Sequence, residues 1–102
     1  MKALLVCSGG MSSAICAKAL QDAATANGQD IQVTECGTQA FEEEVKKGYE
    51  IALVAPQIRH RFSTLESLAK AAGVPIILIK PQGYTPLGGK ILLQQVNEEL
   101  KK

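Results

Sequence analysis

One short segment of this 102-residue chain combines a nucleophile with groups that can hold an anion. It reads Cys7-Ser8-Gly9-Gly10-Met11-Ser12-Ser13. Glycines let a backbone turn tightly with several N–H groups facing inward, and hydroxyls add further hydrogen-bond donors. No lysine or arginine lies within the segment. The segment therefore predicts a loop that binds an anion such as a phosphoryl group without a formal countercharge.

The place of Cys7 in this segment predicts that its thiolate is the reactive group. The N–H groups of a tight loop and the start of a following helix stabilise a negatively charged sulfur. The same donors would hold the phosphoryl oxygens while the sulfur attacks phosphorus, a reaction that depends mostly on positioning and electrostatics. The structural alternative is a small buried residue beside an ordinary turn. The functional interpretation is favoured because cysteine, glycines, hydroxyls and helix start coincide.

Four residues elsewhere are candidates for a supporting role. Pro56 and Gln57 follow an apolar run, and the amide of Gln57 could hydrogen-bond the loop or a partner. His60, the single histidine, is flanked by arginines and could move a proton or attract a phosphoprotein; a solvated basic helix start is the plainer interpretation. Tyr84 is expected in a loop at the rim of the site, where it contacts a partner, covers the site or simply packs.

The other two cysteines have simpler explanations. Cys16 falls on the apolar side of the first helix together with Ile15 and Leu20, which favours a core thiol. Cys36 ends an alternating strand, and a structural role is favoured for it. The alternative is a redox pair with Cys7. The chain has no Cys-x-x-Cys motif, no His/Cys metal spacing and no cofactor motif, so we expect neither a metal nor a cofactor.

Composition limits the kinds of partner. With 46% hydrophobic and 21% charged residues, the chain is predicted to form one folded domain over residues 1–102. A formal net charge of +1 provides no broad basic field for nucleic acid or anionic lipid. The opening residues lack the pattern of a secretory leader, and no apolar stretch is long enough to span a bilayer. We expect a cytoplasmic protein with reduced thiols and no membrane insertion.

The order of the elements predicts an α/β fold. Apolar runs at 3–6, 51–54 and 76–79 suit strands buried on both faces, and the alternating segment 31–36 suits an edge strand. Helical patterns occupy the intervals at 12–27, 41–47, 62–72 and 92–100. Right-handed crossovers then give a flavodoxin-like, doubly wound parallel sheet of order 2-1-3-4 with helices on both faces. Ligands of such folds bind outside the carboxyl ends of the strands, which is where Cys7 falls.

Two stretches give the chain a resemblance to a known family. The segment 4–13, which carries Cys7, and the segment Leu53-Val54-Ala55-Pro56-Gln57-Ile58 resemble the IIB components of the bacterial sugar phosphotransferase system (PTS), lactose/cellobiose type. The cysteine-loop motif is highly specific and the Pro-Gln motif moderately so. Chain length and element order agree, so the resemblance covers essentially the whole sequence.

This resemblance implies a phosphoryl carrier. Cys7 would accept a phosphoryl group from a phosphohistidine on a IIA partner, with Ser8 to Ser13 as the phosphate-binding loop. It would then pass the group to a sugar bound by the membrane-embedded IIC partner. Lactose, cellobiose, chitobiose and other β-glucosides all remain open as the sugar.

Two other functions remain as alternatives. Low-molecular-weight tyrosine phosphatases and arsenate reductases also place a cysteine between the first strand and helix, but they clamp the phosphoryl group with an arginine six residues later, where this chain has Ser13. Hydrolysis also needs an acid, and Asp22 and Asp30 fall outside the predicted site loops. A carrier is therefore favoured over a hydrolase, and over a module that binds a phosphorylated ligand without covalent chemistry.

Overall fold

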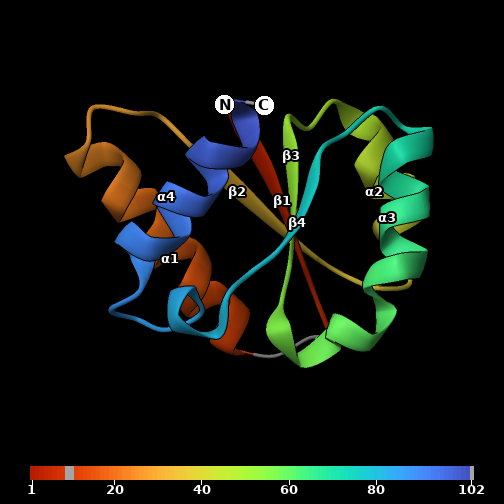
Figure 1. Ribbon diagram of the computed structural model, residues 1–102, viewed down its shortest axis with the longest axis horizontal. Coiled ribbons are helices and arrows are strands. Elements are labelled where there is room, and N and C mark those ends of the chain that lie inside the picture. Colours follow the sequence, from red (N-terminus) through yellow and green to blue (C-terminus); the bar gives the residue numbers. More distant parts are fainter. Residues whose placement is uncertain (9–10, 102) are drawn as a thin grey trace.

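The computed structural model describes residues 1–8 and 11–101 and shows a four-stranded parallel sheet with helices on both faces (Figure 1). The strands are β1 (Lys2–Cys7), β2 (Gln32–Gly37), β3 (Ile51–Val54) and β4 (Ile76–Leu78). The helices are α1 (Met11–Ala26), α2 (Phe41–Glu44), α3 (Phe62–Ala71) and α4 (Gly89–Leu100). Short 3₁₀ turns are η1 (Val45–Lys47), η2 (Pro56–Arg61) and η3 (Pro81–Gly83).

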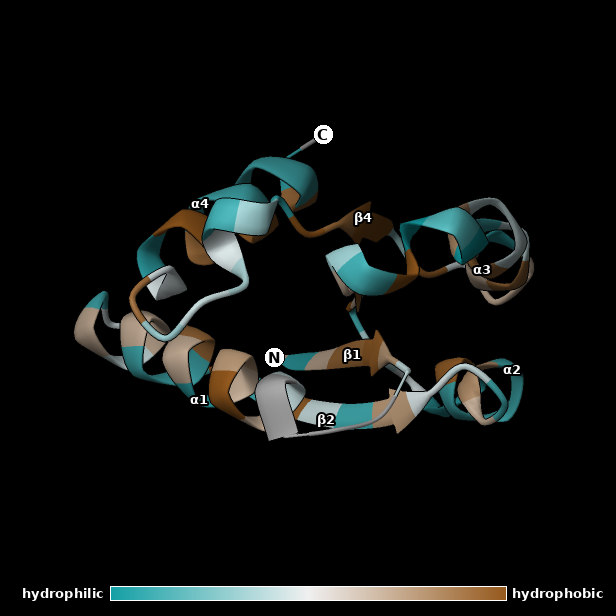
Figure 2. Ribbon diagram, turned by 90° about the horizontal axis from the view of Figure 1, so that it is seen from below, coloured by the Kyte–Doolittle hydropathy of each residue, from teal (hydrophilic) through white to brown (hydrophobic). Residues whose placement is uncertain are grey.

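The strand order is β2-β1-β3-β4, which confirms the predicted flavodoxin-like topology. The central strands β1 and β3 are apolar because helices cover both of their faces; Ala3 to Val6 and Ile51 to Val54 are fully buried. β2 lies at one edge and keeps polar residues exposed. Figure 2 shows this contrast, with β1 mostly hydrophobic and β2 mixed.

The core forms two layers, one on each face of the sheet. Leu5 packs with α1 and α4, in a cluster that includes Leu20. Leu4 packs with α2 and α3, in a second cluster that includes Phe41. From Ala3 to Val6, consecutive residues of β1 belong to different layers because side chains alternate across a strand. The two helix pairs are therefore held to the same central strand.

The helices begin and end close to the predicted positions. Gly28 follows α1 with φ of 74°, and Gly48 follows η1 with φ of 91°, a left-handed conformation that glycine adopts without strain. The expectation for Ile15 was wrong: its side chain is 47% exposed, because the buried stripe of α1 runs through Cys16, Leu20 and their neighbours on the opposite side. Within the described ranges, no helix combines the length and apolar character needed to cross a membrane.

The carboxyl ends of the four strands lie at one edge of the sheet, the lower edge in Figure 1, which we call the carboxyl edge. There, Cys7 ends β1, and η2 and η3 follow β3 and β4. The amino terminus and the end of α4 lie at the opposite edge. The fold thus brings to one edge three segments that the sequence analysis selected.

Candidate functional site

Cys7 is the last residue of β1, at the carboxyl edge. Its side chain is 7% exposed and belongs to the core cluster under α2 and α3, whereas Ser8 is exposed. α1 begins at Met11, only four residues after Cys7, so its first turn starts within about 14 Å of the cysteine. Gly9 and Gly10, and the side chains of Met11 and Ser12, lie outside the part of the chain that the structure describes.

Ser13 is buried at 3% exposure in the first turn of α1, and its hydroxyl donates a hydrogen bond of 2.7 Å to Oε1 of Glu35. Glu35 lies on β2, opposite Leu5 of β1. The sequence predicts that Ser13 belongs to the phosphate-binding loop. A hydroxyl carries one proton, so Ser13 cannot donate that proton to an anion while the bond to Glu35 holds.

The thiols of Cys16 and Cys36 are protonated at neutral pH. Burial raises the pKa of Cys16 from 9.0 to about 11, with the charge of Glu35 as a further cause. Burial also raises the pKa of Cys36 from 9.0 to about 11. The charges of Glu44 and Cys7 are smaller causes of the same rise. Cys16 is 1% exposed in the core, as expected from the sequence, and Cys36 is half-buried beside the cluster that contains Cys7.

Pro56, Gln57 and His60 all lie in η2, directly after β3. Pro56 opens this turn, where a missing backbone N–H costs nothing. Ile58 is 3% exposed and anchors the turn in the core, while Gln57 and His60 are exposed. The turn thus carries two of the predicted supporting residues at the surface of the carboxyl edge.

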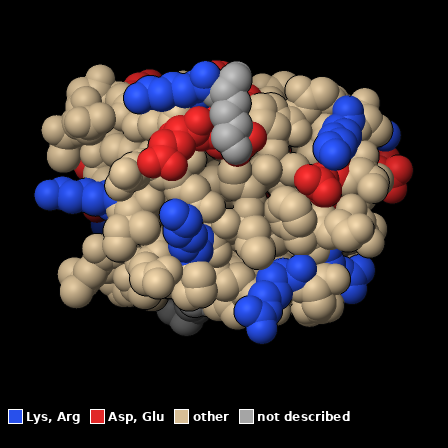
Figure 3. Space-filling model, viewed as in Figure 1, with Lys and Arg blue, Asp and Glu red and all other residues tan. Residues whose placement is uncertain are grey.

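The turn η2 itself carries basic side chains. Arg59 and Arg61 flank His60 and are exposed. Figure 3 shows Lys and Arg side chains over η2 along the lower edge, with no Asp or Glu of the described residues visible beside them on that face. A locally positive surface therefore lies at the same edge as Cys7.

Tyr84 follows η3 and is half-buried. It packs against both core clusters at the edge of the sheet. Of the three roles that the sequence left open for this ring, packing is the one visible in the structure. Leu87, three residues later, is 95% exposed.

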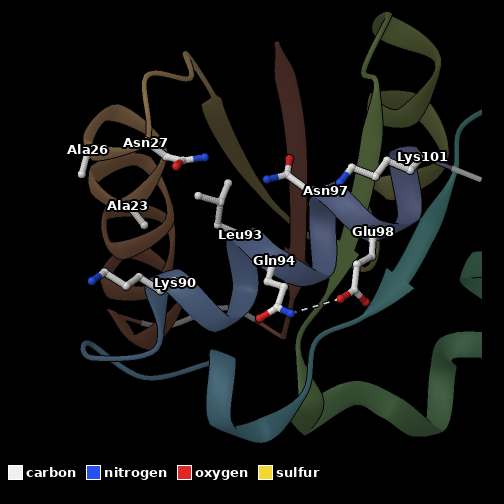
Figure 4. Close-up of a pocket in the computed structure, with 9 residues that line it drawn as sticks. All are labelled: Ala23, Ala26, Asn27, Lys90, Leu93, Gln94, Asn97, Glu98 and Lys101. Atoms are coloured by element: carbon white, nitrogen blue, oxygen red, sulfur yellow. Dashed lines mark hydrogen bonds between the residues drawn. The ribbon is translucent and has the colours of Figure 1, made fainter.

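A groove of about 580 Å³ lies between α1 and α4, away from the carboxyl edge (Figure 4). Ala23 and Ala26 line it on α1, and Leu93 lines it on α4. None of the residues predicted for the site lines this groove. Among the described residues, no group of three or more His, Cys, Asp or Glu side chains is placed to hold a metal ion.

The sequence is similar to known PTS components. Residues 2–95 match the family described as PTS system, lactose/cellobiose specific IIB subunit. The PTS system galactose-specific EIIB component of Lactococcus lactis subsp. cremoris (strain MG1363) is 29% identical over 98 residues, covering 91% of each chain. The PTS system cellobiose-specific EIIB component of Lactococcus lactis subsp. lactis (strain IL1403) has the same identity and the same coverage.

The fold is also similar to two solved structures. The lactose-specific IIB domain from Streptococcus pneumoniae superposes with a TM-score of 0.83 at 24% identity, covering 97% of this chain and 96% of the other. The cellobiose-specific IIB component from Borrelia burgdorferi gives a TM-score of 0.75 at 27% identity, covering 99% and 92%. The architecture described above is therefore the one found in these IIB proteins.

Proposed function

Because this chain belongs to the lactose/cellobiose-specific IIB family of the PTS, we propose that Cys7 carries a phosphoryl group from a IIA protein to a sugar at a IIC transporter. The family places the chain in sugar transport and phosphoryl transfer. The observation that supports the cysteine as carrier is its position: Cys7 ends β1 at the carboxyl edge, four residues before α1 begins. In this proposal residues 1–102 act as one domain in the cytoplasm.

The proposed reaction has two balanced steps. In the first, the Cys7 thiolate attacks phosphorus, the S–P bond forms, and the P–N bond to the donor histidine breaks as its imidazole takes a proton. In the second, a sugar hydroxyl attacks, the O–P bond forms, the S–P bond breaks and the hydroxyl proton is released. N–H groups at the start of α1 stabilise negative charge in both steps.

The surroundings of Ser13 favour a carrier over a hydrolase. A phosphatase of similar layout needs a cationic clamp six residues after its cysteine. This chain has Ser13 there, bonded to the carboxylate of Glu35. Without the clamp, phosphocysteine would persist until it meets its acceptor.

The sugar is proposed only as a class. The galactose-specific and cellobiose-specific relatives are both 29% identical to this chain. Overall identity therefore does not separate a β-galactoside from a β-glucoside. We propose that the IIC partner makes this choice and that the exposed surface around η2 meets the phosphorylated IIA partner.

The proposal is tested by intact-mass analysis. The protein is incubated with phosphoenolpyruvate, the general PTS proteins and candidate IIA partners. We expect one phosphoryl adduct that is absent in Cys7→Ser and retained in Cys36→Ser, the matched control with the same chemical change on the neighbouring strand. An adduct that persists in Cys7→Ser would contradict the proposal, as would repeated cysteine-dependent hydrolysis of an aryl phosphate by the protein alone.

A further inference from the structure

The sheet separates the three cysteines into two sets. Cys7 of β1 belongs to the core cluster under α2 and α3, and Cys36 of β2 packs against the same cluster. Cys16 of α1 belongs to the cluster on the opposite face of the sheet. Cys7 and Cys36 therefore share one face, and both are reduced in the structure.

The register of β1 and β2 sets the distance between Cys7 and Cys36. Cys36 pairs with Val6, and Gly37 pairs with Cys7, so the two cysteines are diagonal neighbours in adjacent parallel strands. Since such strands lie about 4.8 Å apart and rise about 3.3 Å per residue, the two Cα atoms are about 6 Å apart. A disulfide joins Cα atoms roughly 4.4–6.8 Å apart, so this pair is within reach of a bridge.

The side chains of this pair also lie on the same side of the sheet. Strict alternation would send Val6 and Cys7 to opposite faces, yet both belong to the cluster under α2 and α3. Cys36 lies on that face as well, because it is in register with Val6 and packs against the same cluster. The charge of Cys7 acts on Cys36, where it is one cause of the raised pKa. The two thiols therefore meet at the carboxyl edge.

We propose that Cys36 is a resolving cysteine: when a peroxide oxidises Cys7, Cys36 captures the product as a reversible disulfide between the two. The inference rests on the proposed function for the reactivity of Cys7. Its consequence is a carrier that accepts no phosphoryl group while the bridge lasts and regains its thiol on reduction.

Hydrogen peroxide is the oxidant in this reaction. The Cys7 thiolate attacks a peroxide oxygen, the S–O bond forms, the O–O bond breaks and hydroxide leaves, which gives a sulfenic acid. The Cys36 thiolate then attacks the sulfur of Cys7, the S–S bond forms, the S–O bond breaks and a second hydroxide leaves. The protons of the two thiols convert both hydroxides to water. Two thiols are thus oxidised to one disulfide, and one peroxide is reduced to two waters.

Capture depends on the thiolate of Cys36, which is the minor form at neutral pH. Three effects offset this. A thiolate is more nucleophilic the higher its pKa, and attack on the adjacent strand takes place within one chain. Oxidation of Cys7 also removes the charge through which Cys7 raises the pKa of Cys36.

Peptide mass mapping after peroxide treatment, without reduction, tests for the bridge. The oxidised wild type should yield tryptic peptide 3–18 joined to peptide 19–46, and Cys36→Ser should yield no such pair. In Cys36→Ser, Cys7 should instead gain two or three oxygens as sulfinic or sulfonic acid. Peptide 3–18 contains both Cys7 and Cys16, so the matched control is Cys16→Ala, which removes the thiol of the opposite face and should still form the bridge.

The second measurement is phosphoryl acceptance before oxidation, after oxidation and after dithiothreitol. The oxidised wild type should accept no phosphoryl group, and dithiothreitol should restore nearly all of the acceptance. Cys36→Ser should lose acceptance on oxidation and not recover it. Each protein is compared with its own untreated sample, so a variant that folds poorly is recognised before oxidation.

The inference would be overturned if the oxidised wild type held no bridge between Cys7 and Cys36, or held one only in a dimer of two chains. Equal recovery of acceptance in the wild type and Cys36→Ser would also overturn it. If the reduced wild type gains no phosphoryl group from any IIA partner, the proposed function fails instead. The bridged peptide would then still decide whether Cys36 resolves oxidised Cys7.

Discussion

Val6 of β1 and Cys36 of β2 occupy the same register position in adjacent parallel strands, so a second thiol lies one residue away from the register of Cys7. The charge of Cys7 is one of the causes that raise the pKa of Cys36 to about 11. A protonated thiol is a poor nucleophile. Cys36 is therefore a poor nucleophile at neutral pH, although it shares one end of the sheet with Cys7.

We predict that iodoacetamide modifies Cys7 before the other cysteines. With pKa values of about 11, the thiols of Cys16 and Cys36 are ionised in roughly one molecule in a thousand at about pH 8. Peptide mass mapping over a time course measures the order. Labelling of Cys36 ahead of Cys7 would contradict the proposed nucleophile.

Alkaline pH should destabilise the fold through Cys16. Its pKa is about 11 in the folded protein and 9.0 without the surroundings of the fold. Between these values the unfolded chain releases a proton that the folded chain keeps, so the free energy of unfolding falls as pH rises. For this thiol, 1% exposed, the loss is at most about 3 kcal/mol, reached above the pKa of the folded state.

This loss is measured by urea unfolding of the wild type and Cys16→Ala at about pH 8 and about pH 10.5. The variant lacks the titrating group, whereas all other titrations are shared. The stability advantage of the wild type should shrink at the higher pH. A difference that stays constant would show that Cys16 does not titrate as described.

The basic surface over η2 should act on the rate of phosphoryl uptake. Replacing Arg59 and Arg61 by glutamine should slow transfer from the phosphorylated IIA partner by about two- to tenfold at low salt, because local positive charge speeds the encounter with its negatively charged phosphoryl group. Rapid-quench kinetics over a range of salt concentrations measure this. The final amount of Cys7 adduct should not change.

The control removes two positive charges elsewhere, with Lys46 and Lys70 changed to glutamine. Lys46 lies in η1 and Lys70 in the last turn of α3, away from η2. If this control slows transfer as much as the arginine variant does, net charge rather than the surface over η2 sets the rate.

Gly89 should be intolerant of a side chain. A Cβ there would collide with the carbonyl oxygen of Ala19, because α4 begins directly against α1. Gly89→Ala should lower the free energy of unfolding by about 1–3 kcal/mol. Gly37→Ala is the matched control, since its Cβ would meet its nearest atoms at 3.7 and 3.9 Å, and it should have little effect in the same denaturation experiment.

The sequence was sufficient for the elements with strong periodicity. The unbroken apolar runs of β1 and β3 predicted the two central strands, and the alternation in β2 predicted an edge strand. The 3₁₀ turns η2 and η3 were not predicted because three to six residues carry no periodic pattern. A proline opens each of these turns, at Pro56 and Pro81, and would have been a usable indication.

Less of the candidate site than of the fold could be predicted from the sequence. Glu35 was missed because its contact with Ser13 joins residues 22 positions apart and depends on how α1 lies over β2. Ile15 was misplaced because a helix rich in alanine offers more than one apolar face, and the sheet selects only one of them. Tyr84 was left undecided because a loop residue has no neighbours defined by spacing.

The amino terminus and the end of α4 lie at the edge of the sheet opposite Cys7. The amino group of Met1 bonds to the carbonyl of Asp30, and α4 ends at Leu100 on the same side. A tether at either end, whether a fused protein or a solid support, would therefore project away from the carboxyl edge. An immobilised or fused form would leave the carboxyl edge, where β1 ends at Cys7, open to the solution, and a tethered donor would need a linker long enough to pass around the whole sheet.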